Sequence, residues 1–270
     1  MRSAAKGTLW PDLLQGFRLH FLLSVVGVFL CLVLDNGEFL RNSIHNPYAD
    51  PYAEGSTLCV LYFYFNAVSM GGVFSAYVIP ILAAVPYAAS YALEAENRMV
   101  IYKAVRAGNR SYFRSKILVS ALTGGACTAL GSLLFMGALS TYLPITTPAM
   151  LQSAQAFLYQ QFPGFPWVLI YLAFLSGTLW AVSGMCISAF LPSPYLAMCF
   201  PMILQFLLVE TGRLLVLPPE YRLDLLLNGR SGLGSDWGTL IFLTFFTFGA
   251  VILSGILFRK QCERSLQNAF

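Results

Sequence analysis

Residues 94–116 read EAENRMVIYKAVRAGNRSYFRSK and form the most highly charged stretch of a chain that otherwise avoids charge. This stretch separates two long segments, 55–93 and 117–209, in which Asp, Glu, Lys, Arg and His do not occur. In membrane proteins Lys and Arg collect in the loops on the cytoplasmic side, between apolar spanning segments. The pattern therefore predicts a cytoplasmic loop between membrane spans.

The composition places the whole chain in the membrane class. Of its 270 residues, 10% are charged and 57% are hydrophobic, and the mean hydropathy is +0.68. Such values are typical of membrane proteins and not of soluble domains. The apolar runs are continuous, whereas a barrel needs alternating segments, so helices satisfy the backbone in lipid. We therefore expect one all-α integral membrane domain over residues 1–270.

Proline, glycine and polar loops divide the apolar sequence into six expected spans. With about 20 residues needed to cross a bilayer, the spans are 18–34, 57–93, 117–142, 166–191, 195–217 and 237–258. The second is longer than required and contains Gly71-Gly72, Pro80 and Pro86, so we expect a kinked helix that projects past the inner membrane face.

Two further segments flank these spans. Residues 8–17 carry Trp10, Leu13, Leu14 and Phe17 at helical spacing. They predict an amphipathic helix on the membrane surface, and the alternative is a frayed extension of the first span. Residues 218–236 predict a polar outer loop.

The distribution of basic residues sets the orientation. If both termini are cytoplasmic, the inner side holds 12 of the 16 Lys and Arg residues: two before the first span, Arg18 at its inner end, six in the 94–116 loop and three after the last span. The excess of positive charge inside favours six spans with the N and C termini in the cytoplasm.

No catalytic or metal-ligating residue is predicted. His20 and His45 would lie on opposite sides of the membrane, and the six cysteines form no CxxC pair. His20 is interpreted as an interfacial residue, with a titrating functional group as the alternative. The cysteines are expected to be packing residues, although a bridge between Cys31 and Cys59 is conceivable. No Gly-Lys dipeptide occurs, so the chain has no P-loop for ATP.

Ionisable residues inside the spans are few. Glu210 is the only acidic residue in a span, and it has two interpretations: an i,i+3 ion pair with Arg213, or a substrate or gating contact. This scarcity argues against an ion-driven carrier. The fourth span presents a face of small residues that suits close packing, either within one subunit or between subunits. Its members are Ala173, Gly177, Ala181, Gly184 and Ser188.

The 94–116 loop itself predicts a short helix followed by a turn. Gly108-Asn109 supplies a helix stop, and Ser111 is the expected N-cap for the entry into the third span. A short helix joined to two spans on the inner face is suited to transmit a push. The alternative is that the six basic residues of this loop only anchor the chain to anionic lipid.

These features resemble the permease subunits of type 2 ATP-binding-cassette transporters, the ABC-2 exporter class. The likeness rests on Pro86, on Glu94-x-Glu96, on Arg106-Ala107-Gly108 and on the run SYFRSK at 111–116. Family members often carry a glycine soon after the acidic pair, where this chain has 97–99 as Asn-Arg-Met. The resemblance implies that residues 8–17 form the connecting helix of that family and residues 218–236 its outer re-entrant region.

The resemblance also implies partners. The 94–116 segment would contain the coupling helix that docks on a separate ATPase subunit, which holds ATP and Mg, and the chain would pair with a second permease subunit. The residues expected to couple are Glu94, Glu96, Arg98, Lys103, Arg106 and Arg110. No cofactor in this chain and no nucleic acid is expected.

We therefore expect a subunit of an ATP-driven exporter in a bacterial inner membrane. Without an ATPase site of its own, it would move a lipid-like, peptide or other amphipathic substrate outward. The alternative is a non-transporting membrane assembly or immunity protein that binds lipid or a partner through its basic loop.

Overall fold

The computed structural model describes residues 9–38, 40–41, 58–68, 72–147, 165–229, 231–233 and 235–267, and every regular element within them is a helix. In chain order the elements are α1 (Leu9–Gly16), α2 (Leu19–Asp35), α4 (Val60–Val68), α5 (Val73–Ala84), α6 (Ser90–Glu96), α7 (Met99–Ala107), α8 (Asn109–Ser140), α10 (Phe165–Phe190), α11 (Pro194–Leu214), the 3-10 helix η3 (Pro219–Tyr221), α12 (Leu223–Leu227) and α13 (Asp236–Gln267). The sequence interpretations of His45 and Gly71 fall outside the described residues.

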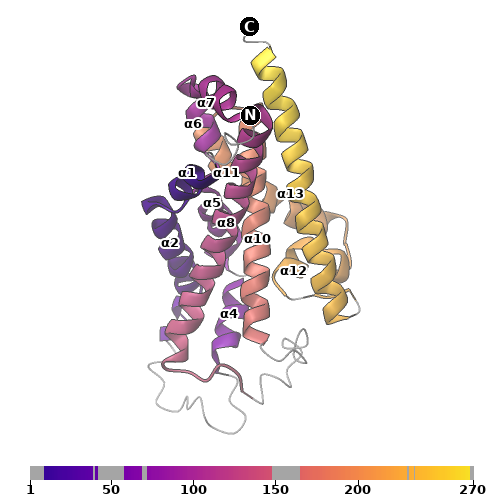
Figure 1. Ribbon diagram of the computed structural model, residues 1–270. Helices are drawn as coiled ribbons and strands as arrows, with labels where there is room; N and C mark the ends of the chain where they lie inside the picture. Colours follow the sequence, from indigo (N-terminus) through magenta and orange to yellow (C-terminus); the bar gives the residue numbers. More distant parts are fainter. Residues whose placement is uncertain are drawn as a thin grey trace.

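Four of these helices, α8, α10, α11 and α13, are long and apolar enough to cross a membrane unbroken. Two bent pairs, α1 with α2 and α4 with α5, raise the number to six if each pair is one span. The prediction of a helical, multi-pass membrane protein is confirmed. The number of six spans stays a prediction. The helix α1, the pair α6 and α7, and the end of α13 lie toward the same end of the bundle, as Figure 1 shows. This end is called the inner end below and the opposite end the outer end, after the predicted orientation, which stays a prediction.

The second predicted span is broken more sharply than a kinked helix. The axes of α4 and α5 differ by 79°, and the chain breaks again between α5 and α6 around Pro86. The new start of α5 at Val73 is stabilised from another helix, because Asp35 at the end of α2 accepts hydrogen bonds from the backbone N–H groups of Phe74 (3.0 Å) and Ser75 (2.6 Å). A carboxylate at a helix N-terminus satisfies free N–H groups and suits the helix dipole.

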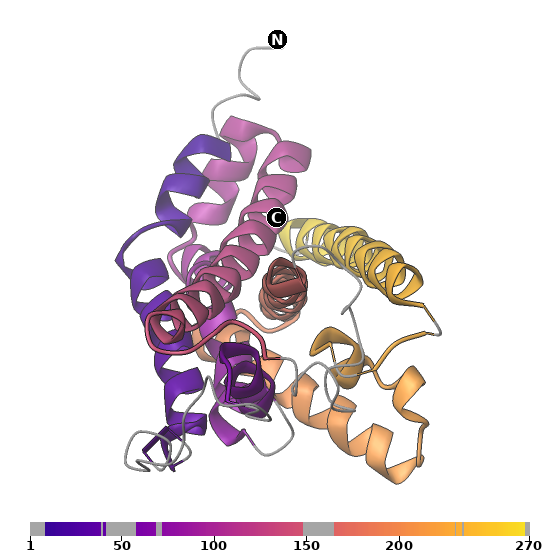
Figure 2. The same cartoon turned by 90° about the horizontal axis from the view of Figure 1, so that it is seen from below.

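The pair α8 and α10 forms the centre of the bundle. In Figure 2, α10 is seen nearly end-on among the other helices. Thr128 donates a hydrogen bond from Oγ1 to the Ala173 carbonyl oxygen (2.8 Å), and a Cβ built on Gly177 would overlap the Thr128 side chain and the Gly124 carbonyl group. The small-residue face of the fourth span therefore packs within the chain, which favours the first of its two interpretations.

The inner end of α8 differs in one detail from the sequence interpretation. Gly108 has φ of 81°, a conformation that favours glycine, and it ends α7 as predicted. The prediction of Ser111 as N-cap is wrong, because α8 already begins at Asn109 and Ser111 lies in its first turn. Arg110, Arg114 and Lys116 thus belong to the first turns of α8. Arg98, between α6 and α7, has φ of 56°, a left-handed conformation that is uncommon for residues other than glycine.

The outer segment 218–236 contains short helices and is not a simple loop. Leu226 and Leu227 of α12 are buried in the main hydrophobic core, and α12 lies against α10 and α11. In contrast, α13 lies at the edge of the bundle and exposes most of its apolar side chains, which suits a helix that faces lipid. Cys31 and Cys59 are both buried and both are free thiols, so the conceivable bridge between them is not formed.

Candidate functional site

The inner end of the bundle contains a buried network of charged residues centred on Lys116. The Lys116 side chain is fully buried, with 0% exposed. Its Nζ atom lies 2.6 Å from Oε1 of Glu94 and 3.7 Å from Oδ1 of Asp12, and it lies 4.9 Å from the ring centroid of Tyr87. Because a buried ammonium group without partners is very costly, these contacts fix the positions of the residues around it.

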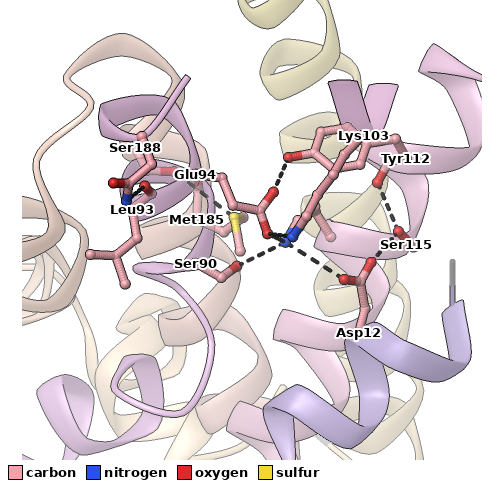
Figure 3. Close-up of polar contacts among 11 residues, drawn as sticks. Asp12, Ser90, Leu93, Glu94, Lys103, Tyr112, Ser115, Met185 and Ser188 are labelled. Carbon is pink, nitrogen blue, oxygen red and sulfur yellow. Dashed lines mark hydrogen bonds and ion pairs between the residues drawn. The ribbon is translucent and has the colours of Figure 1, made fainter. Parts of the chain in front are cut away.

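Glu94 receives three side chains from the neighbouring helices (Figure 3). Besides Lys116, Lys103 of α7 approaches its Oε1 atom at 2.8 Å, and the Tyr112 hydroxyl group of α8 donates a hydrogen bond to its Oε2 atom. Burial raises the pKa of Glu94, but the charge of Lys116 and these hydrogen bonds lower the pKa by more. The net result is a pKa below the ordinary value, so Glu94 is ionised at neutral pH.

Asp12 ties the first helix into the same network. It is buried on the inner side of α1, and it accepts a hydrogen bond at Oδ2 from the Ser115 hydroxyl group of α8 at 2.7 Å (Figure 3). The opposite side of α1 is apolar and exposed, with Trp10 67% exposed. The side of α1 that carries Asp12 therefore packs on α8. The apolar side is free to lie in the membrane interface, a placement that stays a prediction.

An aromatic cluster surrounds the network and extends to the last helix. The rings of Tyr91 (α6) and Phe113 (α8) both pack edge to face on Phe258 of α13, with centroid distances of 5.0 Å and 5.8 Å. Val100 and Ala104 of α7 are buried in the same cluster. Packing and ion pairing together therefore join α6 and α7 to α8 and, through Phe258, to α13.

The outward side of α7 carries a different set of residues. Tyr102 and Val105 are each 78% exposed. Cationic side chains are exposed beside them, among them Lys103 and Arg106 on α7 itself and Arg110 at the start of α8. This surface, called the α7 face below, thus has an apolar centre with positive charge around it.

The structure places the six predicted coupling residues in two groups. Glu94 and Lys103 are joined in the network. Glu96, Arg98, Arg106 and Arg110 are exposed at the same end of the molecule. The second group is free to contact a partner directly, Lys103 is partly exposed on the α7 face, and the buried Glu94 acts within the chain. The sequence analysis gave neither Asp12 nor Lys116 a role in this site.

The sequence gives little indication that these two residues are buried. Asp12 lies in the first turn of the expected helix 8–17, where acidic residues are common, and Lys116 is one of six basic residues in the 94–116 loop. The position of Lys116 directly before an apolar run was the only sign that this cation enters the bundle. A charge at such a position needs a buried partner.

A second polar region lies in the outer half of the bundle. A cavity of about 60 Å³ is lined in part by Tyr64, Gln205 and Asp224. Gln205 is buried, and its Oε1 atom has no hydrogen-bond partner among the described residues. Asp224 pairs with Nη2 of Arg222 at 2.7 Å. This cavity has room for small polar molecules such as water, and its polar groups could bind them.

Glu210 does not line this cavity. It forms the i,i+3 ion pair with Arg213, with Nη1 and Oε1 3.1 Å apart, and both side chains are partly exposed. The ion-pair interpretation is confirmed, and a gating contact stays a prediction. Among the described residues, no group of three or more His, Cys, Asp or Glu side chains could hold a metal ion.

The fold and the site together define a multi-pass helical membrane protein. Buried ion pairs and hydrogen bonds join the helices at its inner end, where the short helix α7 is partly exposed. Comparisons with protein-family models, with curated proteins and with solved structures found no match. The function is therefore inferred from this chain's own residues and contacts.

Proposed function

We propose that the chain is the membrane-spanning subunit of an ATP-driven exporter in a bacterial cell membrane. It would work as a pair with a second permease subunit and with separate ATPase subunits that hold ATP and Mg. The observation that carries the proposal is the contact between Glu94 and Lys116 at 2.6 Å, which fastens α6 to the long helix α8 beneath the exposed α7 face.

The α7 face has the chemistry of a protein-binding surface. Aromatic and arginine side chains are enriched in the energetically important parts of interfaces, and Tyr102 and Arg106 are both exposed here. Surrounding positive charge favours a partner surface with acidic residues. An apolar groove with an acidic rim on the ATPase subunit is the complement that this face requires.

Movement of this face would reach the spanning helices through rigid contacts. Lys103 and Val100 of α7 are held by Glu94 and by the aromatic cluster, and α8 continues from Asn109 through the bundle. A push on α7 would therefore displace α8, and α1 would follow through the hydrogen bond between Ser115 and Asp12. Closely packed elements with discrete arrangements transmit such displacements.

The small size of the cavity lined by Tyr64, Gln205 and Asp224 favours a substrate pathway between two permease subunits. At about 60 Å³ it is far smaller than the roughly 300–1,000 Å³ of ordinary ligand pockets. A lipid-like, peptide or other amphipathic substrate would not fit inside this cavity. The exposed apolar surfaces of α11 and α13 are available to a second subunit as well as to lipid.

The test is purification of the tagged chain from its native membrane, with identification of any P-loop ATPase that accompanies it. We expect an ATPase whose recovery is abolished by Arg106→Glu with Arg110→Glu, and strongly reduced by Tyr102→Ser with Val105→Ser. Charge reversal at an interface opposes association by several kcal/mol, and loss of exposed apolar anchors removes buried area.

Arg264→Glu is the matched control, because Arg264 is an exposed arginine on α13 at the same end of the molecule. This variant should retain the ATPase. A folded wild-type chain that recruits no ATPase under any condition would contradict the proposal and favour a non-transporting role. Equal loss in the control would show that the net charge, not the α7 face, governs recovery.

A further inference from the structure

A larger cavity lies at the inner end beside the charged network, and it shares Tyr87 and Ser90 with the surroundings of Lys116. Its volume is about 540 Å³, and its walls come from the α1–α2 bend, the connection from α5 to α6, and the start of α11. The polar lining residues are Gln15, Arg18, His20, Tyr87, Ser90, Glu96 and Tyr195. The exporter proposal gives no role to this cavity.

Arg18 supplies the positive charge of the cavity, and His20 supplies a second hydrogen-bonding group. Both side chains are exposed, and neither forms an ion pair or a side-chain hydrogen bond within the described part of the chain. In contrast, Arg213, Arg222 and Arg259 all have carboxylate partners. An unpaired guanidinium group favours phosphate, to which it can donate two parallel hydrogen bonds.

The surroundings place Arg18 at the level of lipid headgroups. Arg18 lies two positions after the end of α1, whose exposed Leu9, Trp10 and Leu14 suit the boundary between headgroups and acyl chains. It also directly precedes α2, which enters the bundle. The cavity is lined by apolar residues as well, Leu93 and Met198 among them. A molecule with a phosphate and an adjoining acyl chain would match both parts of this lining.

We propose that this cavity binds the phosphodiester headgroup of a membrane glycerophospholipid, with Arg18 and His20 on the phosphate and Leu93 and Met198 against the acyl region. Glu96 also lines the cavity. Its negative charge disfavours a doubly charged phosphomonoester relative to a singly charged phosphodiester. The proposal requires only that the chain lies in a membrane, so it holds whether or not the chain is an exporter subunit.

The experiment measures the thermal unfolding midpoint of the purified chain in detergent against increasing dioctanoyl phosphatidylglycerol. We expect a saturable increase with this lipid and none with dioctanoylglycerol, which lacks the phosphate, or with inorganic phosphate, which lacks the acyl chains. Dioctanoyl phosphatidic acid should bind more weakly than the phosphodiester. The double variant Arg18→Gln with His20→Gln should bind the lipid at least about tenfold more weakly than the wild type, as expected for lost charge-assisted hydrogen bonds.

Arg264→Gln is the control, since it removes the same charge from an exposed site on α13 and should bind like the wild type. Arg18→Lys keeps a cation and should retain most of the affinity, which keeps the test usable if the double variant does not fold. Wild-type affinity in a folded Arg18→Gln variant would overturn the proposal. So would an equal loss in Arg264→Gln, or equal stabilisation by inorganic phosphate alone.

Discussion

Within the described residues, two groups of buried charges lie toward opposite ends of the bundle, one between α6 and α8 and one at α12, and they are built differently (Figure 1). At the inner end, Lys116 contacts Glu94, 22 positions away, and the adjacent Ser115 contacts Asp12, 103 positions away. At the outer end, Arg222 pairs with Asp224 only two positions along the same short segment. The inner network therefore joins separate helices, whereas the outer pair holds a single segment in its own conformation.

This difference has a mechanical meaning. A shift of the segment with η3 and α12 relative to α10 and α11 would not break the Arg222–Asp224 pair, because both partners would move together, whereas the packing of Leu226 and Leu227 in the core opposes such a shift. Separation of the inner helices would leave buried charges without partners or expose them. The helices are α1, α6, α7 and α8, and the charges are those of Lys116, Glu94 and Asp12. A rigid inner end and a more adaptable outer segment would suit a subunit that receives force on one side and opens on the other.

Lys116→Ala should give the largest effect. It leaves the buried Glu94 and Asp12 carboxylates without their shared cation, and removal of one partner from a buried pair typically costs about 3–5 kcal/mol. We expect a loss of unfolding free energy of this order in detergent titrations of the purified protein. The double variant Lys116→Met with Glu94→Gln should recover part of that loss, since it removes the uncompensated charge. A Lys116→Ala variant as stable as the wild type would show that the network is not structurally important.

Arg222→Ala should be the next in size. The Arg222 side chain is 12% exposed, and the partner carboxylate of Asp224 is more deeply buried. Loss of a hydrogen bond to a charged group costs about 1–3 kcal/mol. Because the pair is local, we expect a smaller decrease in unfolding free energy than for Lys116→Ala and no change in binding of an ATPase. A larger decrease than for Lys116→Ala would reverse the comparison between the two ends.

The pH dependence of stability should isolate Glu94. Its pKa is lower in the folded chain than the ordinary value of about 4.3, so the folded state binds fewer protons than the unfolded state in this range. The stabilisation is fully present above the ordinary pKa and is lost as the pH falls through the folded value. We expect the difference in unfolding free energy between the wild type and Glu94→Gln to be constant near neutral pH and to decrease in acid, by about 1.4 kcal/mol for each unit of pKa depression. A difference that increases in acid would have the wrong sign.

Much of the fold follows from local sequence signals. The charged stretch 94–116 contrasts with its uncharged flanks, and glycine at position 108 ends α7 in a conformation that other residues rarely adopt. Long apolar runs bounded by proline predicted α10 to within one residue at each end and α11 closely at its start. These features depend on neighbouring residues, so a single sequence contains enough information.

The site was less predictable because it depends on distant contacts. Nothing near Asp12 indicates Ser115 as its partner, and only the position of Lys116 directly before the apolar run distinguishes it in the sequence from the exposed Arg114. The break before α5 likewise depends on Asp35 of α2, which lies just beyond the expected first span. Only packing of the helices decides which charges become buried.

Lys103→Ala should have the smallest effect, although Lys103 contacts the same Glu94 Oε1 atom as Lys116 at a similar distance, 2.8 Å against 2.6 Å. The Lys103 side chain is 44% exposed, so water and salt screen its charge, and exposed ion pairs contribute about 0.2–1 kcal/mol. Glu94 also keeps Lys116 and Tyr112 when Lys103 is removed. We expect a small decrease in unfolding free energy that vanishes in high salt, while the effect of Lys116→Ala persists. Equal effects of the two variants would mean that distance to the carboxylate, and not burial of the cation, determines what each lysine contributes.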